Sequence, residues 1–153
     1  MQITNILKRA YHSLILILLF CTLSCQYIGA QKKTPEAVII SFRSKYPGEK
    51  HSAWHTDRNG NYETHFKKKG KRYRADFSPS GQWIETENTV KRKELPKAII
   101  TLLENSYEEH KIIELEFVTH YQKGEFYDLE LKPKGKDKFD LMVRADGQII
   151  GRD

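Results

Sequence analysis

Histidine side chains are the first candidates for metal chemistry in this sequence. After residue 30 they stand at His51, His55, His65, His110 and His120. His51 and His55 lie in a predicted strand, where a separation of four residues is about 13 Å at a rise of about 3.3 Å per residue. His55 and His65 could approach across strands, with Glu63 nearby, but zinc needs three or four ligands that converge on one point. We therefore predict no metal site and no cofactor.

The segment from Asp57 to Glu63 (DRNGNYE) has the oxygen-bearing side chains of a calcium-binding loop. Such a loop needs a glycine after its third ligand and a glutamate at its twelfth position. Gly60 comes too early, and no glutamate follows at the required place. Asn59-Gly60 between two alternating segments is the strongest short signal for a β-hairpin, so a turn is predicted here.

Serines and paired carboxylates are the remaining candidates for catalysis. No serine stands in a nucleophile elbow, and the chain has no glycine-rich phosphate loop. Glu85 with Glu87, and Glu114 with Glu116, alternate along predicted strands. Alternating acids of this kind are typical of a solvated sheet face. We predict that the protein is not an enzyme.

The sequence predicts two short amphipathic helices. The phrase PEAVII, beginning at Pro35, is echoed by PKAIIT, beginning at Pro96. Proline suits the first turn of a helix because its φ is fixed and it lacks an N–H group. The first helix should end at Tyr46-Pro47-Gly48, and the second should end near His110.

Strand patterns with period two follow each helix, separated by turns rich in glycine, proline and asparagine. The predicted strands are 51–56, 62–67, 72–77 and 83–89 in the first half, and 112–121, 126–132, 138–144 and 148–151 in the second. Each half is one helix followed by a four-stranded antiparallel β-meander, with the helix covering one face of its sheet. The predicted fold class is α+β, built as a tandem repeat of this unit.

The sheet faces without helices are predicted to be wet or to dock a partner, because charged residues alternate onto them. These residues are His65, Lys67, Arg72, Arg74, Asp76, Glu114, Glu116, Asp128, Glu130 and Asp140. Most aromatic residues of the first half should fill its core. Trp54 and Trp83 lie near strand ends, where partial exposure would favour a protein partner. The predicted partner-binding residues are Trp54, Trp83, Arg72 and Arg74.

Residues 1–30 have the pattern of a cleavable signal peptide. Lys8 and Arg9 precede the apolar run LILILLF, and the segment closes on Gly29-Ala30. The apolar run of about ten residues is too short for a bilayer crossing, which needs about 20. We predict an exported protein, periplasmic or secreted, without a membrane span after cleavage.

A second cleavage site would give a different product. Thr22-Leu23-Ser24-Cys25 partly matches a bacterial lipobox, although Thr22 stands where an aliphatic residue is preferred. Lipidation at Cys25 would make the protein a membrane-anchored lipoprotein. Both cysteines, Cys21 and Cys25, precede residue 30. Cleavage after Ala30 would therefore leave no disulfide, thiol nucleophile or cysteine metal site.

The formal net charge of +6 is concentrated locally. Basic runs lie at residues 67–72 (KKKGKR) and 91–93 (KRK). Such runs can contact nucleic acid or an anionic surface. An exported protein seldom meets nucleic acid, and lysine also keeps hairpins and sheet edges soluble. We predict solvated surface here and no nucleic-acid partner.

Several phrases together resemble those of the PepSY-like proteins, small exported proteins common in Bacteroidetes. These phrases are PEAVIISFRSKYPG, AWHTDRNGNYETHF and FSPSGQWIETE. The resemblance covers residues 34–152 and implies a fold similar to that of the β-lactamase inhibitor protein. The domain organisation would be a signal peptide at 1–30 and two helix-plus-meander repeats, at 31–91 and 92–153, in one shared domain.

The resemblance brings no catalytic or ligand-binding residues with it. It implies a non-catalytic binding or inhibitory module that docks an unidentified cell-envelope protein on the open sheet face. The alternative is a periplasmic protein that binds a small ligand or an ion between the two halves. A docking module should show an open face with exposed aromatic and charged residues and no enclosed pocket. A ligand carrier should show a closed apolar cavity between the two halves.

Overall fold

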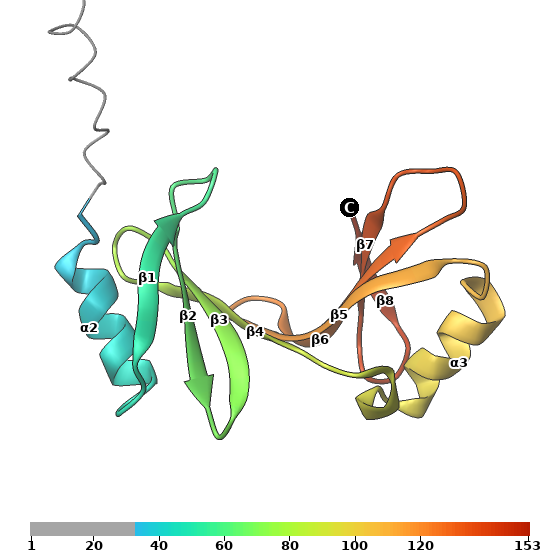
Figure 1. The fold of residues 1–153 in the computed structure, drawn as a ribbon, viewed down its shortest axis with the longest axis horizontal. Coiled ribbons are helices and arrows are strands. Elements are labelled where there is room, and N and C mark those ends of the chain that lie inside the picture. Colours follow the sequence, from blue (N-terminus) through green and yellow to red (C-terminus); the bar gives the residue numbers. More distant parts are fainter. Residues whose placement is uncertain (1–32) are drawn as a thin grey trace, which may run out of the picture. The chain divides into compact units, whose positions relative to one another are not determined.

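The computed structural model describes residues 33–153 (Figure 1). The predicted signal peptide and the cysteine of the lipobox lie outside these residues. Within them, none of the helices has the length and apolar character that a membrane crossing requires.

The two helices, α2 (Glu36–Lys45) and α3 (Lys97–Ser106), both begin directly after a proline, as predicted. The N–H groups of Val38 and Ile39 donate to the carbonyl of Pro35, and Pro96 accepts two such bonds in the same way. The second helix is shorter than predicted, because it ends at Ser106. A short 3₁₀ helix, η1 (Arg92–Glu94), precedes α3 and was not predicted.

Eight strands follow the predicted pattern, with ends that shift by at most two residues. They are β1 (His51–Thr56), β2 (Tyr62–Lys68), β3 (Lys71–Phe77), β4 (Trp83–Thr89), β5 (Lys111–His120), β6 (Gly124–Lys132), β7 (Phe139–Val143) and β8 (Ile149–Arg152). The element order is therefore a helix and four strands, followed by η1, a helix and four strands. The relation of the two halves as a tandem repeat stays a prediction.

The strands form one antiparallel sheet in the order β1 to β8, rather than a separate sheet in each half. Strands β4 and β5 join the halves, with Glu85 opposite His120 and Thr89 opposite Glu116. Directly opposed residues share a face of a sheet. Thr86, which hydrogen-bonds to Tyr46 at the end of α2, therefore shares a face with Thr119.

Both helices cover that same face. Thr119 and Leu115 are four residues apart on β5 and therefore share a face. Leu115 packs with Ile99 and Leu103 of α3. In the first half, Val38 and Phe42 of α2 pack against side chains of β2 and β3. The result is one sheet with two apolar clusters on its helix side, and residues 33–153 place no helix on its other side.

Gly81, in the turn between β3 and β4, lies tightly against α2. Its φ is +85°, and a Cβ atom placed there would lie 2.6 Å from the carbonyl oxygen of Ala37. We expect Gly81→Ala to lower the free energy of unfolding by about 2–3 kcal/mol, from backbone strain of about 1–2 kcal/mol plus displacement of the helix.

The measurement is urea denaturation, with Gly60→Ala as the control. Gly60 has a φ of +83° but no atom within 4 Å of an added Cβ. It should show the backbone strain alone, about 1 kcal/mol. Equal losses in the two variants would mean that the contact with Ala37 is unimportant.

Candidate functional site

Carboxylates dominate the side of the sheet that has no helices. The name acidic face is used here for Glu63, Asp76, Glu85, Glu87, Glu114, Glu116, Asp128, Glu130 and Asp140. Their strands run from β2 to β7, and the pairing of the strands places them on one side: Asp76 lies opposite Glu85, Glu116 opposite Asp128, and Glu130 opposite Asp140.

The centre of the acidic face is hollowed. An open hollow of about 280 Å³ is lined by Arg74, Glu87, Glu114, Glu116, Asp128, Glu130, Lys138 and Asp140. Six carboxylates thus face two cations. The hollow lies where β4 and β5 join the two halves, so neither half could form it alone.

Arg74 is the cation nearest the buried part of this face. Its Nη2 atom lies 2.5 Å from Oε2 of Glu87, and its Nε atom lies 3.6 Å from Oδ2 of Asp76. Glu87 is only 6% exposed. Lys138, at the other end of the hollow, pairs with Glu130 and is itself exposed. A single guanidinium therefore serves two of the most enclosed carboxylates.

Several carboxyl groups of the acidic face have raised pKa values. Burial raises the pKa of Asp76 to about 7, and the neighbouring Glu85 and Glu63 add to this shift although Arg74 opposes it. Burial raises the pKa of Asp128 to about 6, with Asp140 and Glu116 as further causes. Burial and neighbouring carboxylates also raise the pKa values of Glu87, Glu116 and Asp140. A cation that approached this face would favour the ionised carboxylates and lower all of these pKa values.

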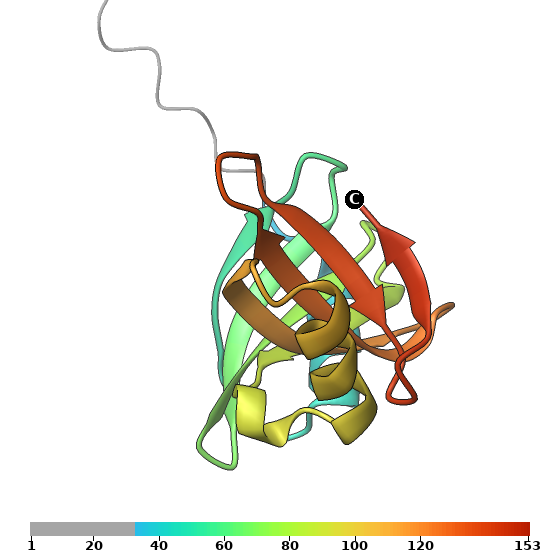
Figure 2. The same ribbon diagram turned by 90° about the vertical axis from the view of Figure 1, so that its right-hand side faces the viewer.

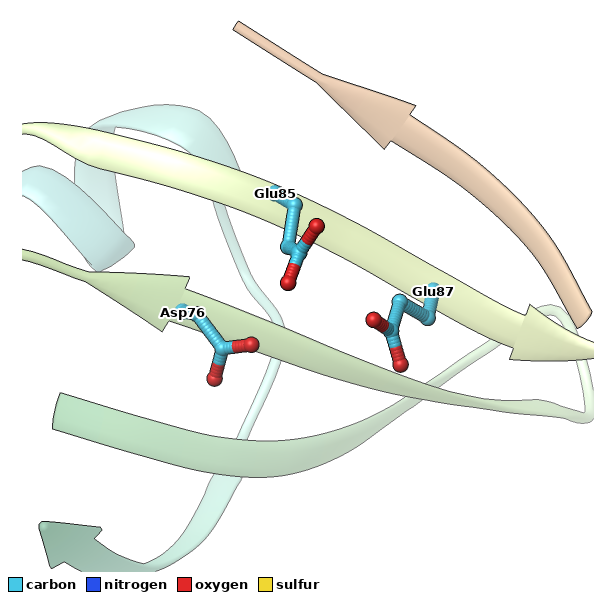
Figure 3. Close-up of side chains that lie close together, drawn as sticks. All are labelled: Asp76, Glu85 and Glu87. Atoms are coloured by element: carbon cyan, nitrogen blue, oxygen red, sulfur yellow. The ribbon is translucent and has the colours of Figure 1, made fainter. Parts of the chain in front are cut away.

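Asp76, Glu85 and Glu87 form the tightest group on this face. Each offers a carboxylate oxygen, and these oxygens lie within 4.8 Å of one another. Figure 3 shows Asp76 reaching from β3 toward Glu85 and Glu87 on β4. Carboxylate oxygens are the ligands of calcium and magnesium. Arg74 already pairs with two of the three residues, so a metal ion would compete with the guanidinium.

The four predicted partner-binding residues do not lie together. Trp54 and Trp83 are partly buried and pack on the helix side, against the cluster that contains Phe42. The Nε1 atom of Trp83 donates to Thr86 at 2.9 Å, and Nζ of Lys45 lies 3.4 Å from the centre of its ring. Arg74 lies on the acidic face, and Arg72 is exposed at the end of β3.

The predicted turn at Asp57 is confirmed. The N–H group of Asp57 donates to the carbonyl of Asn61 at 2.9 Å, and that of Gly60 donates to the carbonyl of Asp57 at 3.2 Å, which closes the hairpin. The N–H groups of Asn59 and Asn61 also donate to Oδ1 of Asp57, each at 2.8 Å. His55 is exposed on β1. His65 lies beside Glu63, with 3.1 Å between Nε2 and Oε1.

Glu87 is the site residue whose environment the sequence did not reveal. Its alternation with Glu85 indicated a solvated face, and this interpretation is wrong for Glu87, which is buried between Arg74 and Val118 on neighbouring strands. Arg74 and Asp76 share a face of β3. An arginine at an inner strand position could have indicated that a buried carboxylate lies beside it.

A family model now places the chain among known proteins. The model described as "Putative beta-lactamase-inhibitor-like, PepSY-like" matches residues 60–151, which is more than half of the sequence. The chain belongs to the PepSY-like family. The family is inhibitor-like by description, and the family resemblance seen in the sequence is confirmed.

Solved structures agree with the PepSY-like assignment in fold. A DUF2874 family protein from Bacteroides uniformis superposes with a TM-score of 0.69 at 18% identity, covering 79% of this chain and 89% of that chain. A BLIP-like protein from Bacteroides fragilis gives 0.67 at 18% identity, covering 79% and 86%. At these identities the likeness concerns the fold alone.

A third structure, described as "putative periplasmic proteins" from Bacteroides eggerthii, gives a TM-score of 0.68 at 18% identity and covers 79% of this chain and 88% of that chain. No curated protein matches the sequence. The PepSY-like chain thus shares its BLIP-like fold with proteins from Bacteroides, one of which is described as periplasmic.

Proposed function

We propose that this protein is an exported, non-catalytic binding module of the cell envelope, which docks a basic segment of a protein partner on the acidic face. The observation that supports it most is the excess of carboxylates over cations in the central hollow. Complementary charge steers association and selects partners, since like charges across an interface are penalised.

The hollow has the character of a receptor for lysine or arginine side chains. Its carboxylates come from β4 to β7 and surround an open space of about 280 Å³. Arg and Lys side chains form their strongest hydrogen bonds with carboxylates. A partner cation would lower the raised pKa values of Asp128 and Glu116, and the free energy of that relief would contribute to binding.

Docking through Trp54 and Trp83 is a weaker part of this proposal, because both rings pack partly into the core. Arg74 contributes by holding Glu87 and Asp76 in place. The alternative, binding of an ion or small ligand, has the group of Asp76, Glu85 and Glu87 in its favour. Since Arg74 already pairs with two of these, we favour the protein partner.

The test is affinity capture by the processed protein from an envelope extract. We expect the double variant Glu116→Gln/Asp128→Asn to retain less than a tenth of the captured partner, because it removes two charges that face the hollow. Quantitative mass spectrometry of the retained proteins measures this, followed by titration of the purified partner.

Glu108→Gln/Glu109→Gln is the matched control, since it makes the same change in net charge at exposed positions after α3. It should capture as much partner as the unmodified protein. Equal losses in the two double variants would indicate non-specific attraction, and a partner whose binding ignores both would contradict docking at the acidic face.

A further inference from the structure

The two basic runs of the sequence meet at one end of the sheet. The first forms the hairpin between β2 and β3, and the second forms the segment that contains η1. In Figures 1 and 2 the tip of this hairpin and η1 both lie at the lower edge of the fold, with a gap between their ribbons in Figure 1. Nζ of Lys71 lies 3.4 Å from Oε1 of Glu94, which ties the two segments together. The name basic tip is used for Lys67, Lys68, Lys69, Lys71, Arg72, Lys91, Arg92 and Lys93.

The basic tip is exposed and carries few compensating acids. All eight of its cationic side chains belong to exposed residues. Glu94 pairs with Lys71, and Glu104 lies 3.5 Å from Arg92. Among residues 33–153, no ion pair is found for Lys67, Lys68, Lys69 or Arg72. A hollow of about 540 Å³ opens beside Lys71, Arg72, Lys91 and Lys93.

The hairpin holds its charges in an arrangement that lowers its own stability. Lys67 lies directly opposite Arg72, and Lys68 lies directly opposite Lys71. Like charges directly opposed on neighbouring strands are destabilising. The two pairs alternate between the faces of the sheet, so both sides of the hairpin tip are positive.

The turn itself departs from the preferred residue. Lys69 and Gly70 have φ values of 49° and 80°, and Lys69 is the one residue other than glycine with positive φ in the described part of the chain. Asparagine, aspartate or glycine is preferred at that position of such a turn. Natural sequences depart from local structural preferences mainly at functional sites. The unfavourable turn residue and the opposed like charges therefore indicate that the basic tip binds a ligand.

We infer that the basic tip binds the surface of an anionic lipid bilayer through the phosphate groups of its lipids. A protruding hairpin beside a short helix can present its lysines together to a flat surface, where each cation contributes to the affinity. Single-stranded nucleic acids are bound in grooves that include aromatic rings for stacking. None of the eight residues of the basic tip is aromatic. Lys68 and Lys69, at the end of the hairpin, line neither of the two hollows beside it, which favours the bilayer.

The experiment measures co-sedimentation of the processed protein with two kinds of vesicle at about 0.1 M salt, where charges are screened beyond about 10 Å. One kind is phosphatidylcholine alone, and the other contains phosphatidylglycerol as well. We expect binding to the anionic vesicles only. Lys68→Gln/Lys69→Gln should weaken it about 25-fold, at about fivefold for each lysine.

Lys134→Gln/Lys136→Gln is the matched control, with the same charge change in the exposed loop between β6 and β7. It should bind as the unmodified protein does, and Lys68→Gln/Lys69→Gln should melt at no lower temperature. Three results would overturn the inference: equal losses in both double variants, displacement by inorganic phosphate beyond that caused by sodium chloride of equal ionic strength, or tighter binding to an RNA oligomer than to the vesicles.

Discussion

The free energy of unfolding is expected to fall by about 3 kcal/mol as the pH rises from about 4 to about 8, the reverse of ordinary acid denaturation. Asp76 and Glu87 are the main causes. Burial raises the pKa of Asp76 from 3.8 to about 7, and Glu85 and Glu63 add to the shift. Burial also raises the pKa of Glu87, from 4.5 to about 9, although Arg74 opposes that shift. The side chain of Asp76 is 14% exposed, so solvent screens this effect only partly.

The sign follows from where the proton is bound. Between pH 3.8 and about 7 the folded protein keeps a proton on Asp76 that the unfolded chain has released. Raising the pH through this window therefore favours the unfolded chain. Asp128, with a pKa raised to about 6 by burial and by Asp140, acts in the same direction. Although burial opposes it, hydrogen bonds from Asn61 lower the pKa of Asp57, which acts weakly in the opposite direction because Asp57 is exposed.

Urea denaturation across this range of pH measures the effect. Asp76→Asn should flatten part of the slope and raise stability at pH 8, since it removes the charge and keeps the shape. The remaining slope should come from Glu87 and Asp128. Glu109→Gln, at an exposed position after α3, should leave the slope unchanged. A stability that increases with pH in the unmodified protein would mean that the acidic face is better compensated than its two cations indicate.

Local signals predicted most of the fold. Pro35 and Pro96 mark the helix starts, and the turn at Asn59-Gly60 forms as predicted. Each of these signals acts within a few residues of sequence. The joining of β4 to β5 brings Glu87 beside Val118, which is distant in sequence, and no local pattern reports such a pairing.

The acidic face illustrates the same limit. The alternation of Asp76, Glu116 and Asp128 along their strands predicts that all three lie on an open face of the sheet. Their mutual proximity, and the raised pKa values that follow from it, depend on the register between β3 and β6. The role of Arg74 as a shared counter-ion depends on it too, because Glu87 lies opposite Arg74 only in that register.

Phe42→Ala is expected to lower the free energy of unfolding by about 3–5 kcal/mol, the usual range for removal of a buried phenyl ring. Phe42 is 0% exposed and anchors α2 to the sheet. Its ring centre lies 5.4 Å from that of Phe66 and 5.8 Å from that of Trp54, both at edge-to-face angles. Removal of the ring would leave a cavity and end both contacts, so the helix would lose its main attachment.

The control on the same helix is Ile40→Ala. Ile40 is 57% exposed, and alanine favours helix, so its loss should be below about 0.5 kcal/mol. Tryptophan fluorescence reports on the first half alone, because Trp54 and Trp83 both lie there, whereas circular dichroism reports on all strands. Since β4 and β5 join the halves in one sheet, the two signals should change together in Phe42→Ala. If fluorescence changes at a lower urea concentration, the halves unfold separately and the shared sheet couples them only weakly.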